Sequence, residues 1–413
     1  MNKRLLILTD APTAPLFSPR IRSLLFYLEK SGWKCTVASE KALNTEFTYP
    51  HCKHIQWSYY HERKAFSNTI KWCAAQLLNA KDIAFSRFIL NELKEEKFDA
   101  LLCSSFNEFP LQAAATIADQ WRLPLVIDLR DITEQWGNTN FTQHSINTPW
   151  TLFNQWLMNF YKRRIILVRN KVLQKATAIT TVSTWHQTLL SKFNPHTYLV
   201  YNGFKEDEFF AKDVPSDQFI ISYSGKLYDL NFRDPQLLFE ALRLLIDKAN
   251  IAPEDIKVEF HIDNGSIVPT MQMIEKYQLQ QICSISGYIP QKELIPLLHK
   301  SSILLVLTCK STPNGTHGIM GTKFFEALGV EKPVLCVRSD EECLAQVIQE
   351  TNAGLAGTNA EEVADFILDK YAEWKKNGFT HQAVNQEVKK QFTRQYQAKQ
   401  FEQILLKLIH EKQ

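Results

Sequence analysis

Short apolar, β-branched runs alternate with longer amphipathic stretches along this chain. In the first half, runs such as RLLILTD (4–10), DALLCSS (99–105) and LPLVIDL (123–129) are separated by stretches whose apolar residues recur three and four positions apart. This alternation is typical of βαβ units, in which a helix returns the chain so that successive strands pair in parallel. The pattern predicts an α/β fold.

The alternation restarts at Phe219 with FIISYS, KVEFHI, ICSIS, SSILLVL and PVLCV. The segment before it, 202–217, is charged and turn-rich, as domain linkers are. A chain of 413 residues also exceeds what one hydrophobic core usually serves. We therefore expect two Rossmann-like domains, 1–205 and 206–381. They are followed by a helical tail, 382–413, whose single apolar stripe predicts that it docks on another surface.

The start of the chain and the composition limit the class of protein. MNKRLLIL places two basic residues before only four apolar ones, which is too short for a signal peptide. No run reaches the roughly 18 apolar residues that a membrane span needs. With 45% apolar and 22% charged residues, the composition is that of a globular protein. We expect a cytoplasmic protein.

The eight cysteines include no C-x-x-C pair, and most lie in apolar runs such as DALLCS and PVLCV. Free, buried thiols in a reducing compartment explain this distribution better than disulfides or a zinc site. The sequence also lacks an Asp-x-Asp pair suited to Mg²⁺ and a histidine cluster suited to zinc. We expect no metal site.

Positive charge is concentrated in the first half. Residues 1–205 carry 25 lysines and arginines and 15 acids, a net charge of +10, whereas the remainder carries 22 and 29, a net charge of −7. Two explanations stay open: a plain difference between two domains, or an acidic partner such as an anionic membrane surface or a lipid phosphate. Nucleic acid is not expected, because the chain has no compact basic tract and no zinc-finger, helix-turn-helix or RNA-recognition signature.

The segment MGTKFFEALGVEKPVL (320–335) has the strongest chemical signature. A loop ending in Gly321 and Thr322 opens a helix, so unpaired backbone N–H groups and the positive helix end favour a phosphate. Thr322 is expected to cap that helix, and Lys323 adds a cation. Glu326 lies one turn further, where a carboxylate can accept two hydrogen bonds from a diol such as ribose. Taken alone, Glu326 is better explained as an ordinary acid on a helix surface, since Glu is a common helix former.

This segment resembles the donor-binding segment of glycosyltransferase family four, E-x-x-G-x-x-x-x-E-A-x-x-x-G-x-P-V. The matching residues are Gly321, Glu326, Ala327, Lys332, Pro333 and Val334. Two positions depart from the pattern, since Gly318 stands where the first Glu would be and Glu331 replaces the later Gly. The resemblance implies that Glu326 binds the donor ribose. It also places Gly318 beside the donor sugar, without the carboxylate that the family has there.

Further segments extend the resemblance over nearly the whole chain. FIISYSGKLYDLNFRDP (219–235) resembles the family's strand that ends in G-R-L and is followed by a Lys, which implies that Gly225, Lys226 and Arg233 bind the donor diphosphate. ISGYIPQKELIPLLHK places Tyr288 where the family contacts the nucleobase. Without the resemblance, Lys226 and Arg233 are equally well explained as solvated loop charges.

In the first half, LPLVIDLRDITEQW (123–136) resembles the D-x-R-D segment of bacterial members that build surface polysaccharides. The resemblance implies that Asp131 contacts the donor sugar or the acceptor and that Arg130 orients it. Without the resemblance, the segment DLRD (128–131) is explained as a salt-bridged loop. The first βα loop offers Arg20, which we expect to approach the donor phosphates.

The family has the GT-B fold, in which two Rossmann-like domains face across a cleft and a C-terminal helix crosses back to the first domain. The resemblance implies a retaining, metal-independent transferase without a cofactor. It would move a sugar from a UDP- or GDP-linked donor to a glycan or polyprenyl-linked acceptor in surface-polysaccharide synthesis. Two alternatives stay open: a sugar-nucleotide epimerase on the same scaffold, and a catalytically silent binding module, which Gly318 at the place of a family Glu favours.

Residues 149–164, PWTLFNQWLMNFYKRR, bring six aromatic and apolar residues together on a helix that ends in three cations. The six are Trp150, Phe153, Trp156, Leu157, Phe160 and Tyr161. Trp and Tyr beside Lys and Arg are typical of helices at a membrane interface. A core face or an interdomain contact would explain the same stripe. Peripheral attachment to the inner face of the plasma membrane is our hypothesis, with Lys162, Arg163 and Arg164 on anionic lipid.

Overall fold

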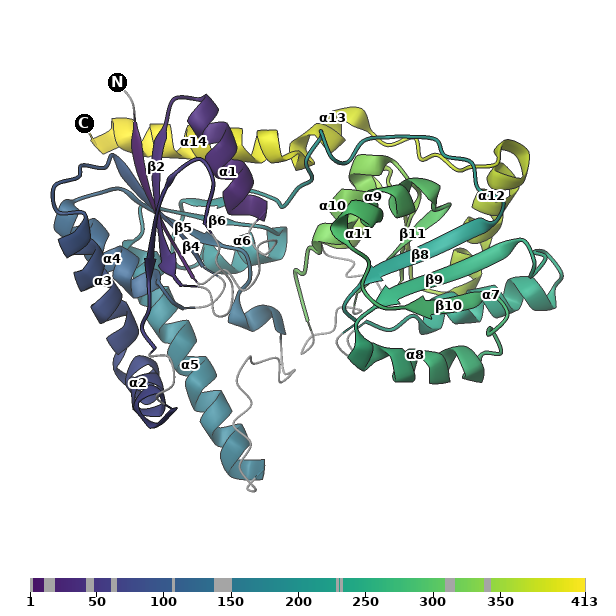
Figure 1. Cartoon of the computed structure of the whole chain (residues 1–413), viewed down its shortest axis with the longest axis horizontal. Coiled ribbons are helices and arrows are strands. Elements are labelled where there is room, and N and C mark those ends of the chain that lie inside the picture. The colour runs from purple at the N-terminus through teal and green to yellow at the C-terminus, as the bar shows by residue number, and fades with distance from the viewer. Residues whose placement is uncertain are drawn as a thin grey trace. The chain divides into compact units, whose positions relative to one another are not determined.

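The computed structural model describes residues 3–10, 19–41, 48–60, 65–105, 108–136, 151–227, 230, 233–308, 316–337 and 343–412. The chain divides into two compact units, Met1–Tyr201 with Arg394–Gln413, and Asn202–Thr393. Each unit has its own parallel sheet with helices packed on it (Figure 1). The predicted α/β fold with two Rossmann-like sheets is confirmed.

The first unit is built on a seven-stranded parallel sheet in the order β3-β2-β1-β4-β5-β6-β7. The strands are β1 (Arg4–Thr9), β2 (Lys34–Glu40), β3 (Lys53–Trp57), β4 (Ala100–Ser105), β5 (Leu125–Leu129), β6 (Ala178–Thr181) and β7 (Thr197–Leu199). β1 pairs with β2 on one side and with β4 on the other, so the strand order reverses beside β1. At such a reversal the carboxyl ends of the strands are accessible to a ligand.

Helices cover both faces of this sheet. They are α1 (Pro19–Lys30), α2 (Ala65–Leu78), α3 (Ala80–Glu92), α4 (Leu111–Trp121), α5 (Thr151–Lys175), α6 (Thr184–Leu190) and α14 (Arg394–Lys412), with a 3₁₀ turn at Thr133–Trp136. Alternate residues of β1 enter different cores, because successive strand side chains point to opposite faces. Leu6 and Leu8 pack with α3 and α4, whereas Leu5 and Ile7 pack with α1 and α14.

The tail is not the single helix expected over 382–411. It forms α13 (Gln386–Lys389) and a 3₁₀ turn (Lys390–Phe392) in the second unit, then α14 in the first. Thr393 is extended (φ −85°, ψ 150°), which ends the helical path between the two pieces. The apolar stripe of α14 packs against α1 through Phe401, Leu405 and Leu408.

The second unit has a six-stranded parallel sheet in the order β10-β9-β8-β11-β12-β13. The strands are β8 (Phe219–Gly225), β9 (Ile256–Ile262), β10 (Cys283–Ser286), β11 (Ile303–Leu307), β12 (Val334–Val337) and β13 (Gly354–Gly357). The helices are α7 (Gln236–Asp247), α8 (Asn264–Lys276), α9 (Gln291–Lys300), α10 (Thr322–Val330), α11 (Leu344–Thr351), α12 (Ala360–Asn377) and α13. The order again reverses, here between β8 and β11.

Two edge strands, β3 and β13, were absent from the strands expected from the sequence. β13 has the sequence GLAG, and glycine is depleted in strands. Gly354 has φ +150°, and a Cβ there would lie 2.0 Å from the carbonyl oxygen of Val334. Gly354 allows the backbone of β13 to approach β12 closely. This requirement comes from tertiary packing, so strand propensities do not predict it.

Asp82 on α3 is buried, with 8% of its surface exposed, and accepts a hydrogen bond of 3.0 Å from the backbone N–H of Ala113 at the start of α4. Burial raises the pKa of Asp82 to about 7, although the Ala113 N–H acts in the opposite direction. Since the pKa in the folded protein exceeds the unfolded value of about 4, the fold favours the neutral form, and stability is lost as pH rises through 7.

Asp82→Asn is therefore expected to stabilise the protein at pH 8 by up to about 4 kcal/mol, the free-energy equivalent of about three pKa units. At pH 4 the difference should nearly vanish, because the wild-type carboxyl is then neutral as well. Urea unfolding followed by circular dichroism at both pH values measures this. Asp119→Asn, at an exposed acid, is the matched control. An equal effect of Asp82→Asn at both pH values would contradict the assignment.

Candidate functional site

A cavity of about 270 Å³ lies in the second unit at the carboxyl ends of β8 and β11, beside the start of α10. In a doubly wound sheet, ligands bind at this edge and at the reversal of strand order. Its lining residues are Tyr223, Gly225, Lys226, Arg233, Tyr288, Val306, Leu307, Thr308, Thr316, Ile319, Gly321, Thr322 and Lys323. Those singled out from the sequence are Gly225, Lys226, Arg233, Tyr288, Gly321, Thr322 and Lys323.

The first turn of α10 borders the cavity. Gly321 is the N-cap residue (φ −65°, ψ 139°), and no side chain caps the helix there. The expectation that Thr322 caps the helix is wrong, because Thr322 is already the first helical residue. The first backbone N–H groups of a helix have no partner within it, and its dipole adds a partial positive charge. This end of α10 therefore suits an anion.

Lys323 extends from α10 over the end of β8. Its Nζ lies 3.5 Å from Ser224 Oγ, a long contact for a hydrogen bond. Gly225 makes this path possible, because a Cβ at that residue would lie 2.2 Å from Lys323 Cε, and its φ of +147° favours glycine. Burial lowers the pKa of Lys323, with Glu326 opposing the shift and Arg233 adding to it. A desolvated ammonium group of this kind gains strongly from an anionic ligand.

Arg233 and Lys226 are held by the end of β8. The buried Tyr223 donates a hydrogen bond of 3.0 Å to the carbonyl oxygen of Lys226. Arg233 Nη1 donates to the same carbonyl and lies 3.4 Å from Tyr223 Oη. These contacts tie Lys226 and Arg233 to the carboxyl end of β8.

In the part of the chain that the structure describes, the cavity lining includes Lys226, Arg233 and Lys323 and no carboxylate. Three cations held close together repel one another unless a counter-charge neutralises them. A diphosphate, with several anionic oxygens, would satisfy these cations and the α10 N–H groups at the same time. The arrangement therefore suits a polyanionic ligand.

Two residues that the family resemblance singled out lie nearby without lining this cavity. Glu326 is partly buried one turn into α10, close enough to Lys323 to influence its pKa. Gly318 has φ +67°, in the left-handed region. A Glu at this position would be strained there by roughly 1 kcal/mol, so the departure from the family pattern goes with a backbone that suits glycine.

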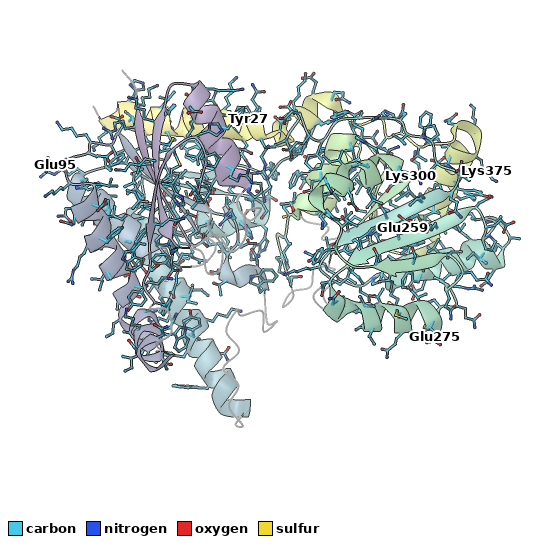
Figure 2. The ribbon with its side chains drawn as sticks, in the orientation of Figure 1. Tyr27, Glu95, Glu259, Glu275, Lys300 and Lys375 are labelled. Atoms are coloured by element: carbon cyan, nitrogen blue, oxygen red, sulfur yellow. The ribbon has the colours of Figure 1, made fainter. Side chains whose placement is uncertain are left out.

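A polar row on β9 and β10 was missed in the sequence. Glu259 lies on β9 (Figure 2), with Lys257 Nζ at 2.6 Å and His261 Nε2 at 3.7 Å. His261 Nδ1 lies 2.6 Å from Ser286 Oγ on β10. Contact with His261, and less strongly with Lys257, lowers the pKa of Glu259 to about 2 against the effect of burial. The sequence did contain a signal for this row. Lys257, Glu259 and His261 alternate with apolar residues along β9, which places their side chains on the same face of the strand.

Several cavity residues were also missed. Thr308 directly follows β11, so the rule that ligands bind beyond the carboxyl ends of parallel strands could have identified it. Tyr223 could have been found as the large polar side chain near the end of β8. Thr316 and Ile319 carry no local signal, because their place depends on the path of the loop before α10.

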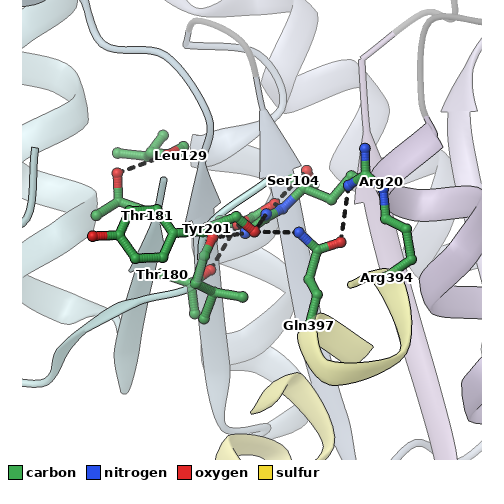
Figure 3. Close-up of polar contacts among 10 residues, drawn as sticks. Arg20, Ser104, Leu129, Thr180, Thr181, Tyr201, Arg394 and Gln397 are labelled. Atoms are coloured by element: carbon green, nitrogen blue, oxygen red, sulfur yellow. Dashed lines mark hydrogen bonds and ion pairs between the residues drawn. The ribbon is translucent and has the colours of Figure 1, made fainter. Parts of the chain in front are cut away.

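The structure places Arg20 in the core of the first unit (Figure 3). Its guanidinium group bonds both carboxylate oxygens of Asp128, at 2.9 and 3.1 Å, and donates to the carbonyl oxygens of Val200 and Tyr201. Asp128 also accepts from Ser104 and Thr180. With 2% of its surface exposed, Arg20 does not occupy the phosphate-facing position expected from the sequence, and we leave it out of the site.

Opposing effects set the pKa of Asp128 in this ion pair. Burial alone would raise the pKa of Asp128, but the attraction of Arg20 and the hydrogen bonds from Arg20 and Thr180 lower it. The network continues to α14, where Gln397 donates to the Tyr201 carbonyl and accepts from Arg394. The network thus joins three strands to α1 and α14.

Arg130 and Asp131 follow β5 in the first unit. Arg130 Nη2 lies 3.7 Å from Asp10 Oδ1, and its buried Nε has no hydrogen-bond partner within the described part of the chain. Asp131 accepts a hydrogen bond of 2.7 Å from Gln135. Burial raises the pKa of Asp131, although Gln135 and the charge of Arg130 oppose the shift. Gln135 rather than Arg130 therefore holds this carboxyl directly.

Two buried residues that the sequence analysis did not identify are Arg169, which contacts the 3₁₀ turn Thr133–Trp136, and His186. Arg169 pairs with both carboxylate oxygens of Glu134 at 2.6 Å. His186 is buried, and neither ring nitrogen has a hydrogen-bond partner among the described residues. Burial, with the charge of Arg169, lowers the pKa of His186 to about 3, so the ring is neutral.

Within the described ranges, no three His, Cys, Asp or Glu side chains gather as a metal site would require. No disulfide joins the cysteines described there, and Cys35, Cys103, Cys336 and Cys343 are buried. Cys309 lies outside the described residues.

Several solved structures share this fold. A glycosyltransferase from Rickettsia africae aligns at 13% identity with a TM-score of 0.65, over 99% of both chains. Sucrose-phosphate synthase from Thermosynechococcus elongatus aligns at 13% identity and 0.66, over 99% of this chain and 100% of that one. The Anabaena protein HepE, solved with UDP and glucose, aligns at 14% identity and 0.61, over 98% and 100%.

At these identities the likeness shows the fold, which is the GT-B architecture expected from the sequence. The sequence matches no protein-family model and no curated protein.

Proposed function

We propose that this protein is a glycosyltransferase of family four that transfers a sugar from a nucleotide-diphosphate donor. The observation that carries the proposal is the cavity at the start of α10, which among the described residues is lined by three cations and by no carboxylate. The likeness to HepE, solved with UDP and glucose, supports a UDP-linked donor, and the family resemblance keeps a GDP-linked donor as the alternative. The resemblance of 320–335 to the family's donor segment supports the same class of ligand.

Each part of the cavity has a proposed role toward the donor. Lys226, Arg233 and Lys323 neutralise the diphosphate, while the N–H groups after Gly321 bind a phosphate oxygen. We further propose that Tyr288 contacts the nucleobase, that Glu326 binds the ribose and that Gly318 lies beside the donor sugar. Gly225 leaves the space that the Lys323 side chain occupies.

In the proposed reaction, the bond between the sugar C1 and the diphosphate oxygen breaks, and its electron pair leaves with the diphosphate. The acceptor oxygen forms the new bond to C1 with retention of configuration, and its proton is released. Negative charge grows on the leaving group, so cations already in place lower the barrier. The scheme assigns this stabilisation to side chains and α10, and needs neither a metal ion nor a cofactor.

We assign the donor to the second unit and the acceptor to the first. Asp131, whose pKa is raised by burial, is our candidate for contacting the acceptor or the donor sugar, with Arg130 beside it. The proposed acceptor is a glycan or a polyprenyl-linked sugar in surface-polysaccharide synthesis. The proposed location is the cytoplasm, at the inner face of the plasma membrane.

A donor assay tests the proposal. UDP, GDP and their glucose conjugates are titrated into the full-length protein by calorimetry, and donor turnover is then followed with glycan and polyprenyl-linked acceptors. A transferase releases nucleoside diphosphate in proportion to glycosylated acceptor. An epimerase would isomerise the sugar instead, and a silent module would bind without turnover; either result would overturn the proposal.

Glu326→Ala is expected to weaken donor binding by about 1.5–3 kcal/mol, the scale of a hydrogen bond to a charged group. Calorimetry with the tightest-binding donor measures this. Glu275→Ala, at an exposed acid on α8 (Figure 2), should leave affinity unchanged. If Glu326→Ala retains full affinity in a folded protein, the ribose role belongs to another residue.

A further inference from the structure

Large apolar side chains are exposed on three helices of the first unit. They are Ile70, Leu77 and Leu78 on α2, Ile83 on α3, and Trp156, Phe160 and Leu167 on α5. Each exposes between 45% and 70% of its surface. Burying such groups on another surface would be favourable at about 25 cal/mol per Å².

The exposed face of α5 combines apolar and basic residues. Trp156, Phe160, Arg163, Leu167 and Lys171 follow one another at three- and four-residue spacing, and all are exposed. The rings of Trp156 and Phe160 stack with centroids 5.8 Å apart. One side of the helix therefore presents two aromatic rings, an aliphatic side chain and two cations.

The structure revises the composition of the interfacial stripe expected from the sequence. Arg164 turns inward to Glu108 and Asn79, and Tyr161 lies 3.5 Å from Glu108. Lys162 is partly buried, so Arg163 is the exposed cation of the expected three. Trp150 lies outside the described residues, as do the side chains of Phe153 and Leu157.

A second exposed stripe lies on α2. Ile70, Cys73 and Leu77 are spaced by three and four residues and are exposed, with Leu78 beside them. Lys71 is the one charged residue in this helix. α2 and the first half of α5 both reach the lower end of the first unit in Figure 1, the end away from α14.

The charge of α5 indicates what this face binds. The helix carries Lys162, Arg163, Arg164, Arg169, Lys171 and Lys175 and no acid. Arg164 and Arg169 pair with Glu108 and Glu134. No ion pair joins Arg163 or Lys171 to another of the described residues. Two exposed cations among exposed aromatic and aliphatic side chains complement a surface that is anionic outside and apolar beneath.

We infer that the exposed faces of α2 and α5 form a docking surface for an anionic lipid bilayer. Trp156, Phe160 and the aliphatic residues enter the headgroup boundary, while Arg163 and Lys171 contact lipid phosphates. None of the described helices is long and apolar enough to cross a bilayer, so the contact is with its surface. A polysaccharide would use the aromatic pair but not the aliphatic face of α2, and a second copy would oppose cation to cation.

Vesicle sedimentation of the full-length protein tests the surface without reference to activity. The wild type should bind phosphatidylcholine vesicles containing roughly a third phosphatidylglycerol, and should be released as salt rises toward about 0.5 M. It should not bind phosphatidylcholine alone. The Arg163→Gln/Lys171→Gln variant should bind roughly 30-fold more weakly, from about 1 kcal/mol for each cation at an anionic surface.

Two further variants separate the contributions. Trp156→Ser/Phe160→Ser should lower binding at least about tenfold through lost apolar burial. Lys248→Gln/Lys300→Gln makes the same change in charge at exposed sites of the second unit and should bind like the wild type.

Three outcomes would overturn the inference: no vesicle binding by the wild type, equal binding to neutral and anionic vesicles, or equal binding by all variants. Light scattering that shows a dimer lost in Trp156→Ser/Phe160→Ser, without vesicle binding, would instead identify a contact between copies. Binding to a soluble polysaccharide alone would identify a glycan platform. Because the donor cavity belongs to the second unit, calorimetry with UDP distinguishes failure of this surface from failure of the proposed activity.

Discussion

Lys323→Met is expected to lower turnover of the nucleotide-sugar donor about 10²- to 10³-fold, the scale of losing one preorganised donor at a site of developing charge. Methionine keeps most of the side-chain volume beside Gly225, so the cavity wall is retained while the ammonium group is lost. The effect should fall mainly on kcat, because the leaving diphosphate carries most charge in the transition state. UDP affinity should fall less, by about tenfold to a hundredfold.

Steady-state kinetics and calorimetry with UDP separate the two effects. Lys300→Met, at an exposed lysine outside the cavity (Figure 2), is the matched control and should resemble the wild type. Burial lowers the pKa of Lys323. As the pH is raised, UDP affinity should therefore begin to fall at a lower pH than it would for a lysine with an ordinary pKa. Lys323→Met should lack that alkaline limb. Normal turnover in a folded variant would exclude Lys323 from the reaction.

Asp128→Asn is expected to destabilise the first unit by about 3–5 kcal/mol, because it leaves the buried guanidinium of Arg20 without its counter-charge. Since the pKa of Asp128 is lowered, its contribution to stability is present above the unfolded value of about 4 and is lost as pH falls below it. Urea unfolding from pH 7 to pH 3 should therefore show the wild type approaching the variant in acid.

Two controls decide whether the missing charge or the altered packing is responsible. Arg20→Met/Asp128→Leu removes both charges and should be much less destabilised than Asp128→Asn. Asp119→Asn breaks an exposed pair with Lys175 and should change stability by at most about 1 kcal/mol. UDP binding by Asp128→Asn should persist under conditions where the protein is folded, because the cavity belongs to the other unit. Equal destabilisation by Asp128→Asn and the double variant would contradict the ion-pair explanation.

The strands of both sheets were largely predictable because buried parallel strands leave continuous apolar runs in the sequence. β8 and β11 are runs of this kind, and both were expected at nearly their observed positions. β3 and β13 at the sheet edges lack such runs, and β13 depends on the close approach of Gly354 to β12. The break at Thr393 was equally invisible, because the residues on both sides favour a helix.

Part of the candidate site was readable from the sequence for a related reason. Gly225 ends a strand, Lys226 directly follows it, and Gly321 and Lys323 open a helix. Chain position alone places such residues at one edge of a parallel sheet. Arg20 also lies at the start of a helix that follows a strand, yet it points into the core toward Asp128. Chain position gave its place on α1 but not its direction.

The alternation of apolar runs and amphipathic stretches by itself determined the α/β class and the two parallel sheets, because burial of a strand or a helix face leaves a periodic trace in the chain. Only the tertiary structure decided which way individual side chains point, which residues they pair with and whether they are exposed. Arg20 and Asp128 became a core ion pair, Lys323 met Gly225, and Arg163 rather than Arg164 faced solvent on α5. These outcomes depend on contacts between residues far apart in the sequence, and a linear pattern does not record which distant side chain fills a given space.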